Sequence, residues 1–293
     1  MNILYIINPA SGKLRRDGSF ANRLAAAAKR IGVAGEMQFT LAPQHATELA
    51  ATAAERGVKC VVAVGGDGTL NEVAQGLVHT ECRLGLVPCG SGNGLGRHLG
   101  IVGGLERSLQ ILAQGVMKAI DTGCVNAYPF FNVMGIGFDA EISAQFNRMT
   151  SRGLPAYIRV GVKTFFSYRP RHYHFFNDTA TERTTAWMIS VANSAQFGNN
   201  AYIAPNAQVD DGVLELTCLR PAHPLEVLPL TYRLFAGTIE RSSRAVTMQS
   251  DSFTIECEGS NTIHTDGEVH QTGSVLNIKT FPKSLNILVP PST

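Results

Sequence analysis

The sequence has little cysteine, and none of it is spaced as a metal or redox centre requires. Its six cysteines include no Cys-x-x-Cys pair and no close grouping with histidine. This scatter argues against a zinc site and against a disulfide framework. Cys60, Cys124, Cys218 and Cys257 lie in apolar or alternating runs, and we expect them to be small buried side chains, kept reduced in the cytosol.

The sequence also lacks an excess of charge of either sign. Its 25 lysines and arginines nearly balance 23 aspartates and glutamates, which gives a formal net charge of +2. A protein that binds nucleic acid through bulk electrostatics is usually strongly basic. We therefore expect no nucleic-acid partner.

A long apolar run is missing as well. No segment approaches the ~18 uninterrupted apolar residues of a membrane span. Residues 1–9 have no basic stretch and too short an apolar run for a signal peptide. We expect a cytoplasmic protein that at most touches the inner face of the membrane. The sequence leaves the oligomeric state open, a homodimer included.

What the chain does have is length and a regular pattern. Its 293 residues exceed the usual size of one domain, so two domains are expected. The first part, up to about residue 120, alternates strand and helix patterns, which predicts a doubly wound α/β domain. The predicted strands are 2–7, 37–41, 59–64 and 83–87, and the predicted helices are 20–31, 46–56 and 105–113.

Beyond residue 121 the pattern changes to short β-type runs separated by turn residues. These runs predict an antiparallel β-sandwich as the second domain. The runs are 130–138, 186–192, 213–219, 252–258 and 275–279, and a last strand is expected at 284–289. The expected domains are 1–122 and 123–283, with the final segment 284–293 returning to the first.

One helix is predicted in the second half, at 154–168. Its apolar residues Tyr157, Ile158, Val162, Phe165 and Phe166 lie largely on one side, with arginine and lysine around them. Such a helix either rests on an anionic membrane surface or packs on the core of the protein itself.

The most informative stretch is a buried-looking strand that runs into Gly65-Gly66-Asp67-Gly68-Thr69-Leu70-Asn71. Glycines let backbone N–H groups approach a ligand closely, and the start of a helix favours an anion. Asp67 would repel phosphates unless a cation lay between them. The stretch therefore predicts a site for phosphate and a divalent metal, whereas a plain strand-to-helix turn would explain only one of the glycines.

Turns of this kind follow three of the predicted strands, at 8–12, 65–69 and 90–94. Ligands of open α/β sheets bind outside the carboxyl ends of the strands, so we expect the three turns to converge on one ligand. None of them has the spacing of a Walker A loop or the acidic residue of a dinucleotide fingerprint. Lys13, Arg15 and Arg16 either contact phosphate or form a solvated basic turn.

Two acidic turns stand out in the second half. His264-Thr265-Asp266-Gly267-Glu268 is either an ordinary Asp-Gly hairpin turn or a turn that presents an acid to a substrate. In the second case Asp266 could accept the proton of a hydroxyl that attacks phosphorus. The turn at 205–213 fits a hairpin or a cation site with oxygen ligands equally well.

Taken together, these motifs resemble the diacylglycerol kinase catalytic-domain family, lipid kinases that include bacterial diacylglycerol kinases and sphingosine kinases. The glycine–aspartate motif alone is shared with NAD kinases and phosphofructokinases. The full series is more specific, and it favours a functional Asp266 over a plain hairpin. The matching motifs follow the family order over nearly the whole chain: 8–12, 65–69 with Asn71 and Glu72, 88–93, 204–212 and 266–268.

The resemblance implies an α/β nucleotide-binding domain followed by a β-sandwich, with ATP and Mg²⁺ as cofactors and a membrane lipid as acceptor, in phospholipid metabolism. It implies that Asp67 acts through Mg²⁺ and that Asp266 is the general base, with Glu268 close by. A structural cation would be held by Asp211 and by the carbonyl groups of Gln208 and Val213. The implied ATP site comprises Asn8, Pro9, Ala10, Ser11, Gly12, Thr40, Gly65, Gly66, Asp67, Gly68, Thr69, Leu70, Asn71 and Ser91.

The stretch 90–95 departs from the bacterial diacylglycerol kinase pattern, because Gly94 stands where an acidic residue is usual. It looks more like the sphingosine and ceramide kinase version, so the acceptor lipid is open between diacylglycerol and a sphingoid lipid. Two rival functions are an NAD kinase-like enzyme with a soluble substrate and a non-catalytic nucleotide- or lipid-binding module.

Overall fold

A computed structural model describes residues 2–12, 14, 17–147, 164, 167–259 and 261–291. The chain divides into two compact units, Met1–Ile120 with Lys283–Thr293, and Asp121–Pro282. The helix predicted at 154–168 lies outside the described residues except for Thr164, Ser167 and Tyr168, and so do Lys13, Arg15 and Arg16.

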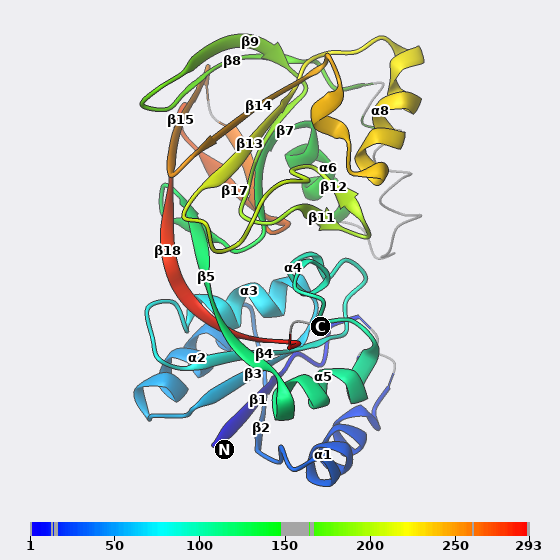
Figure 1. Ribbon diagram of the computed structural model, residues 1–293, viewed down its shortest axis with the longest axis vertical. Coiled ribbons are helices and arrows are strands. Elements are labelled where there is room, and N and C mark those ends of the chain that lie inside the picture. The colour runs from blue at the N-terminus through cyan, green and yellow to red at the C-terminus, as the bar shows by residue number, and fades with distance from the viewer. Residues whose placement is uncertain are drawn as a thin grey trace. The chain divides into compact units, whose positions relative to one another are not determined.

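The first unit is built on a parallel sheet whose strands lie in the order β2-β1-β3-β4-β18 (Figure 1). Every residue of β1 and β3 is buried, as a parallel sheet covered on both faces requires. The strands are β1 (Ile3–Ile7), β2 (Glu36–Phe39), β3 (Cys60–Gly65), β4 (Arg83–Pro88) and the end of β18 (Val275–Val289).

Helices cover both faces of this sheet, so the doubly wound α/β architecture is confirmed. Helix α1 packs with α5, and α2 packs with α3 (Figure 1). Helix α1 ends at Gly32, whose left-handed φ of 86° and N–H bond to the Ala28 carbonyl close it. The helices are α1 (Phe20–Ile31), α2 (His45–Glu55), α3 (Asp67–Gln75), α4 (Gly94–His98) and α5 (Gly104–Gln114).

Strand β18 differs from the sequence-based expectation, which had two separate strands at 275–279 and 284–289. It is one strand of 15 residues. Its first part pairs antiparallel with β15 in the second unit, and Ile287 pairs in parallel with Leu84 of β4 in the first. Pro282 and the positive φ of Lys283 (50°) lie inside the strand where it changes partners. Because β18 pairs with β15 before this point and with β4 after it, its backbone stays extended. The turn-forming residues in the sequence do not reveal this.

The second unit contains a six-stranded antiparallel sheet in the order β14-β13-β10-β7-β16-β17. A second group of strands, β18-β15-β8-β9 with β5 and β6, is also joined by antiparallel pairs within this unit. The strands are β5 (Val116–Val125), β6 (Tyr128–Phe130), β7 (Val133–Gly137), β8 (Arg171–Phe176), β9 (Thr181–Ala186), β10 (Met188–Ala192), β11 (Gln196–Gly198), β12 (Ala201–Tyr202), β13 (Leu214–Leu219), β14 (Ala245–Ser250), β15 (Ser252–Cys257), β16 (Asn261–Thr265) and β17 (Glu268–Thr272).

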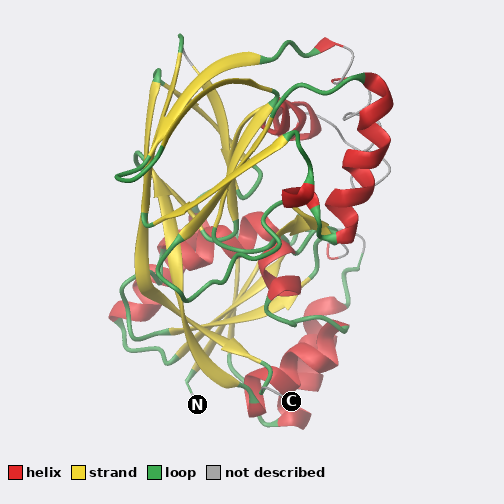
Figure 2. Cartoon of the chain, turned by 45° about the horizontal axis from the view of Figure 1, so that its top comes forward, coloured by secondary structure: helices red, strands yellow, loops and turns green. Residues whose placement is uncertain are grey.

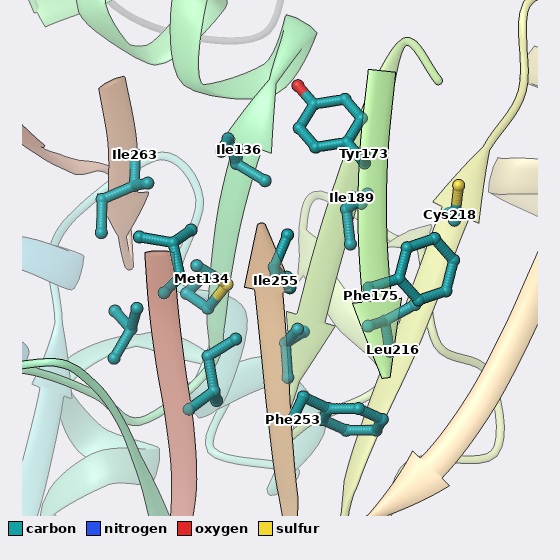
Figure 3. Close-up of a cluster of buried hydrophobic side chains, with 14 of the residues drawn as sticks. Met134, Ile136, Tyr173, Phe175, Ile189, Leu216, Cys218, Phe253, Ile255 and Ile263 are labelled. Atoms are coloured by element: carbon teal, nitrogen blue, oxygen red, sulfur yellow. The ribbon is translucent and has the colours of Figure 1, made fainter. Parts of the chain in front are cut away.

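The core of this unit is formed by side chains from both groups of strands. Met134 and Ile136 of β7 lie against Phe175 of β8 and Ile255 of β15, all of them buried (Figure 3). Strand β15 alternates inward and outward side chains, the pattern of a strand with one face in the core. The predicted antiparallel β-sandwich is therefore confirmed.

Three helical segments of the second unit were not expected from the sequence. They are α6 (Phe138–Asn147), α8 (Pro224–Ala236) and the short 3₁₀ helix η2 (Ile239–Arg241), which lie at the margin of the strands (Figure 2). Helix α8 contains Pro229, and an internal proline normally argues against a helix. The helix begins at Pro224, where a proline is favourable, and His223 and Glu226 form a capping box at its start.

All six cysteines are free thiols, and Cys60, Cys218 and Cys257 are buried as expected, whereas Cys124 is only half-buried. Burial raises the pKa of the Cys60 thiol, and likewise that of Cys218, to about 12. Within the part of the chain that the structure describes, no helix is both long enough and apolar enough to cross a bilayer.

Candidate active site

The three polar turns predicted from the sequence follow β1, β3 and β4, and side-chain hydrogen bonds join them. The Ser11 hydroxyl in the first turn accepts the N–H of Gly66 in the second, at 2.7 Å. The Asn8 side-chain amide donates to the Thr69 hydroxyl at 3.0 Å. These contacts fix the first turn against the start of α3.

Asp67 joins the second turn to the third. One carboxylate oxygen accepts the N–H of Asn93 at 2.8 Å, and the other accepts the N–H of Gly94 at 2.9 Å. Asp67 thereby caps the N-terminus of α4, a helix that the glycine-rich sequence did not indicate. The sequence predicted that Asp67 would bind a metal ion. In the structure, its carboxylate also holds the second and third turns together.

Glycine is required in these turns because their backbones touch. A Cβ on Gly65 would lie 2.4 Å from the Thr69 hydroxyl oxygen, and a Cβ on Gly90 would lie 2.8 Å from the Cα of Gly66. Gly12 has a positive φ of 45°, and a Cβ there would lie 2.1 Å from the Cys89 carbonyl oxygen. Close approach of backbone in glycine-rich turns at strand ends is typical of phosphate-binding sites.

The other residues that were predicted to bind ATP differ in their exposure to solvent. Thr40 continues from β2, and its N–H donates to the Ile7 carbonyl at 2.9 Å, beside the end of β1. Gly68 and Ser91 are exposed, as are Pro9 and Ala10, whereas Leu70 is half-buried. Thr69 and Asn71 are buried, and one contact of the Asn71 side chain is with Gln75 in the same helix.

The backbone of Gly92 lies close to the Asp67 carboxylate. A Cβ on Gly92 would lie 2.8 Å from Oδ2 of Asp67, so glycine at this position leaves that oxygen approachable. Carboxylate oxygen is the donor that Mg²⁺ prefers. The residues present therefore fit a Mg²⁺ ion next to phosphates bound on these turns.

In the second unit, Asp266 and Gly267 form the two-residue turn between β16 and β17. Both have positive φ, 52° and 90°, as the tightest hairpin turns require. The Asp266 carboxylate accepts three backbone N–H groups, from Phe131 at 2.8 Å and from Asn132 and Val133 at 2.9 Å each. The hairpin interpretation is correct for the backbone, but the side chain does more than an ordinary turn needs.

A buried polar pair lies directly behind this turn. Nε2 of His264 is 3.1 Å from Oδ2 of Asp139, and the Ser190 hydroxyl donates to the same oxygen at 3.1 Å. Nδ1 of His264 accepts the N–H of Gly267 at 3.3 Å. A Cβ on Gly135 would lie 2.1 Å from the Asp139 carboxylate, so only glycine leaves room for the pair.

Asp139 and Ser190 were missed by the sequence reasoning. Asp139 lies in the first turn of α6, a helix that was not predicted, and it is 125 residues away from His264. Its second oxygen, Oδ1, is buried without a hydrogen-bond partner among the described residues. A signal was nevertheless present, since Asp139 directly follows an apolar stretch, where an acidic side chain usually has a buried partner.

His270 lies on β17, beside the same turn. Its Nε2 is 2.8 Å from the Thr265 hydroxyl, and its ring stacks on Tyr128 with centroids 4.0 Å apart. Burial lowers the pKa of His270, and the nearby His264 adds to this effect. Glu268 begins β17 and is exposed.

The residues expected to hold a structural cation lie in the turn before β13. Gln208 and Asp211 are exposed, and Asp211 accepts the N–H of Val213 at 3.2 Å. The buried Asp121, which the sequence reasoning did not single out, accepts the N–H of Gly212 at 2.7 Å. Among the described residues, no three His, Cys, Asp or Glu side chains lie together as a metal-binding group.

Family models cover almost the whole chain. The diacylglycerol kinase catalytic domain matches residues 2–125, and the YegS C-terminal NAD kinase β-sandwich-like domain matches residues 132–289. The boundary between the matches lies near the change from parallel to antiparallel strands.

Individual relatives agree with these matches. Lipid kinase YegS of Escherichia coli K12 is 28% identical over 242 residues, which cover 80% of this chain and 79% of that protein. An uncharacterised protein of Synechocystis sp. is 29% identical over 242 residues, and the chain spans only 55% of its length. The crystal structure of a diacylglycerol kinase from Bacillus anthracis shares the fold, with a TM-score of 0.77 at 19% identity and coverage of 99% and 97% of the two chains.

The motif order, the two folds and the matches to both domains agree with one another. The first unit has the glycine-rich turns of the catalytic domain, and the second has the β-sandwich that accompanies it. This chain belongs to the diacylglycerol kinase catalytic-domain family of lipid kinases, in the branch that carries the YegS-type β-sandwich domain.

Proposed function

We propose that this protein is an ATP- and Mg²⁺-dependent lipid kinase that transfers the γ-phosphoryl group to a hydroxyl of a membrane lipid, diacylglycerol or a sphingoid lipid. The observation that carries the proposal is the mutual bracing of the turns after β1, β3 and β4, through Ser11–Gly66 and Asp67–Asn93. Rigid, glycine-lined turns at strand ends are where an α/β sheet binds phosphates.

In this proposal the turns bind ATP through backbone N–H groups and through the N-terminus of α3, where unpaired N–H groups favour an anion. Asp67 would hold Mg²⁺ on the side that Gly92 leaves open. A bound Mg²⁺ would neutralise the negative charge that develops on the phosphates. The direct bonds of Asp67 to Asn93 and Gly94 keep its carboxylate in place for that task.

Asp266 is proposed as the general base. The three N–H groups that it accepts favour the ionised carboxylate and fix its direction. Glu268 extends the acidic character of the same turn.

The cation at Gln208, Asp211 and Val213 remains a further proposal. The exposed Asp211 carboxylate offers oxygen, although Asp121 already ties the turn through Gly212. Measuring the melting temperature with EDTA and then with added Ca²⁺ or Mg²⁺ tests it, and a rise that is lost in Asp211→Asn is the expected result. A melting temperature that does not depend on divalent cations would contradict it.

The function is tested by incubating the purified protein with γ-labelled ATP, Mg²⁺ and a total lipid extract. We expect label in an organic-soluble product, which mass spectrometry then identifies as a phosphorylated lipid. Label in a soluble product when NAD is the acceptor would favour the NAD kinase-like alternative. ATP binding without transfer to any lipid or to NAD would favour a non-catalytic module.

A further inference from the structure

Helix α8 presents a row of large apolar side chains to solvent. Leu225, Leu228 and Tyr232 are 81%, 79% and 74% exposed, and Phe235 is 42% exposed. Their spacing of three or four residues places them on one side of the helix. Single exposed apolar residues are ordinary, but four in a row on one helix form a patch that a soluble protein normally uses.

This row is not the side that packs on the protein. Leu234, on the other side of α8, packs against a buried cluster that includes Val133, Met188 and Ile203. The exposed side carries no charge, and the Thr231 hydroxyl donates to the Val227 carbonyl of the same helix at 2.8 Å. The exposed residues of α8 are Pro224, Leu225, Leu228, Pro229, Thr231, Tyr232, Phe235 and Ala236.

The surroundings of α8 are basic. Residues 220–244 contain four arginines and two glutamates, with no lysine or aspartate, and Arg220 is paired with Glu182 of β9 at 2.8 Å. Glu226, the single acid of the helix, is neutralised by the Arg244 guanidinium, with N–O distances of 2.9 and 3.0 Å. Arg241 on η2 is 74% exposed and lies 3.6 Å from Glu240, so Arg233 on α8 is the arginine of this segment for which the described residues show no ion pair.

We infer that α8 is a membrane-binding helix that inserts Leu225, Leu228, Tyr232 and Phe235 into the surface of a bilayer with anionic headgroups. An uncharged apolar row with arginine beside it is the pattern of a helix that lies in a membrane interface. Each basic residue near an anionic bilayer adds about 1 kcal/mol of attraction. The role of this membrane contact rests on the proposed function, because a lipid kinase must reach an acceptor that lies in the membrane.

A second copy of the chain suits this surface less well. Helix α8 has 13 residues and is therefore about 20 Å long, so its exposed side covers on the order of 200 Å². A stable dimer buries about 800 Å² on each partner. Two copies would also bring two Arg233 side chains, each without an ion pair among the described residues, to one interface, whereas an anionic bilayer compensates their charge.

The test is flotation with vesicles of phosphatidylcholine, with and without phosphatidylglycerol, in the absence of ATP. We expect the wild-type protein to float with the vesicles that contain phosphatidylglycerol. The double variant Leu228→Asp/Tyr232→Asp should bind them about tenfold more weakly or worse. Arg233→Gln, which removes one positive charge, should weaken binding to the anionic vesicles about fivefold and leave binding to phosphatidylcholine alone unchanged.

The matched control is Val102→Asp, which places the same charge on an apolar residue that is 51% exposed in a loop of the first unit. It should float like the wild type, and equal melting temperatures establish that all the variants are folded. Wild-type flotation of the double variant would overturn the inference. So would a dimer in light scattering that the double variant splits while vesicle binding persists, because the occupant is then a second copy.

Failure of this inference and failure of the proposed function are distinguishable. Flotation needs neither ATP nor an acceptor, so its absence leaves phosphoryl transfer to detergent-dispersed lipid unaffected. Conversely, a protein that floats through α8 but transfers no phosphate would retain the membrane surface and refute the kinase proposal.

Discussion

Nε2 of His264 lies 3.1 Å from Oδ2 of Asp139, and both side chains are only 5% exposed. Because the backbone N–H of Gly267 points to Nδ1, that nitrogen accepts and Nε2 carries the proton given to Asp139. The pair thus connects the start of α6 to the turn that holds Asp266. It acts on the turn through the backbone. His264 belongs to the stretch that the sequence singled out, whereas Asp139 does not.

His264→Gln tests this connection. Glutamine places an amide nitrogen near the position of Nε2, so it keeps the bond to Asp139 and removes the acceptor of the Gly267 N–H. Loss of one such bond is worth about 1.4 kcal/mol, so we expect a kcat for lipid phosphorylation about tenfold lower. The KM for ATP should not change, because the turns that we propose to bind phosphate lie in the other unit.

The matched variant is His264→Asn, whose shorter amide restores a group near Nδ1 and should recover part of kcat. If His264→Gln lowered the melting temperature but kept the wild-type kcat, the pair would have a purely structural role.

The variants Gly92→Ala and Gly68→Ala distinguish two roles of the glycine turns. One is to pack against Asp67, and the other is to bind ATP. A Cβ on Gly92 would lie 2.8 Å from the Asp67 carboxylate, whereas a Cβ on Gly68 meets nothing within 4 Å. We expect Gly92→Ala to lower both the melting temperature and ATP affinity. Gly68→Ala should keep or raise the melting temperature, since alanine in a helix is favoured over glycine by about 0.5–1 kcal/mol.

ATP affinity is the second measurement on Gly68→Ala, made by titration calorimetry. A methyl group on the exposed start of α3 should weaken ATP binding about tenfold although the fold is intact. Unchanged ATP affinity in this variant would mean that the phosphates bind elsewhere.

Asp266→Asn tests the general base. Asparagine keeps one oxygen for the N–H groups of Asn132 and Val133, but its amide group opposes the N–H of Phe131. We expect turnover to fall by a factor of about 10²–10⁴, the usual contribution of a general base, with ATP affinity nearly intact. Turnover at the wild-type rate would refute the assignment, and Glu268→Gln should be the milder variant because Glu268 is exposed.

His270 makes the stability of the second unit depend on pH. Its pKa is lowered in the folded protein, first by burial and then by His264, so the unfolded chain binds a proton more readily. No stability is lost well above the unfolded value of about 6.5. As the pH falls through that value, stability decreases until the folded-state pKa is passed.

The measurement is the free energy of unfolding by urea at pH 7.5 and at pH 5. Wild type should lose more stability between these values than His270→Gln, which cannot titrate but keeps a polar group near Thr265. An equal loss in both proteins would assign the pH dependence to other groups.

The local sequence predicted those strands and helices that depend on residues within the element itself. The strands β1 and β3 are apolar throughout, and α1 ends at a glycine. The predicted bounds of all three elements therefore agree with the structure to within about two residues. Helix α8 escaped prediction because Pro229 lies inside it, while its stability comes from the cap at His223 and from packing of Leu234.

The sequence alone determined the fold class and the motifs to which we assign the chemistry: the glycine turns, Asp67 and the Asp266-Gly267-Glu268 turn. Residue type and spacing indicated the glycine turns and Asp67, whereas only the resemblance to the family favoured a functional Asp266 over an ordinary hairpin turn. Only the tertiary structure decided what those residues touch. The bonds of Asp67 to Asn93, of Asp266 to Phe131 and of His264 to Asp139 join positions 26, 135 and 125 residues apart. Such contacts follow from how strands pair and helices pack, and no local pattern encodes them.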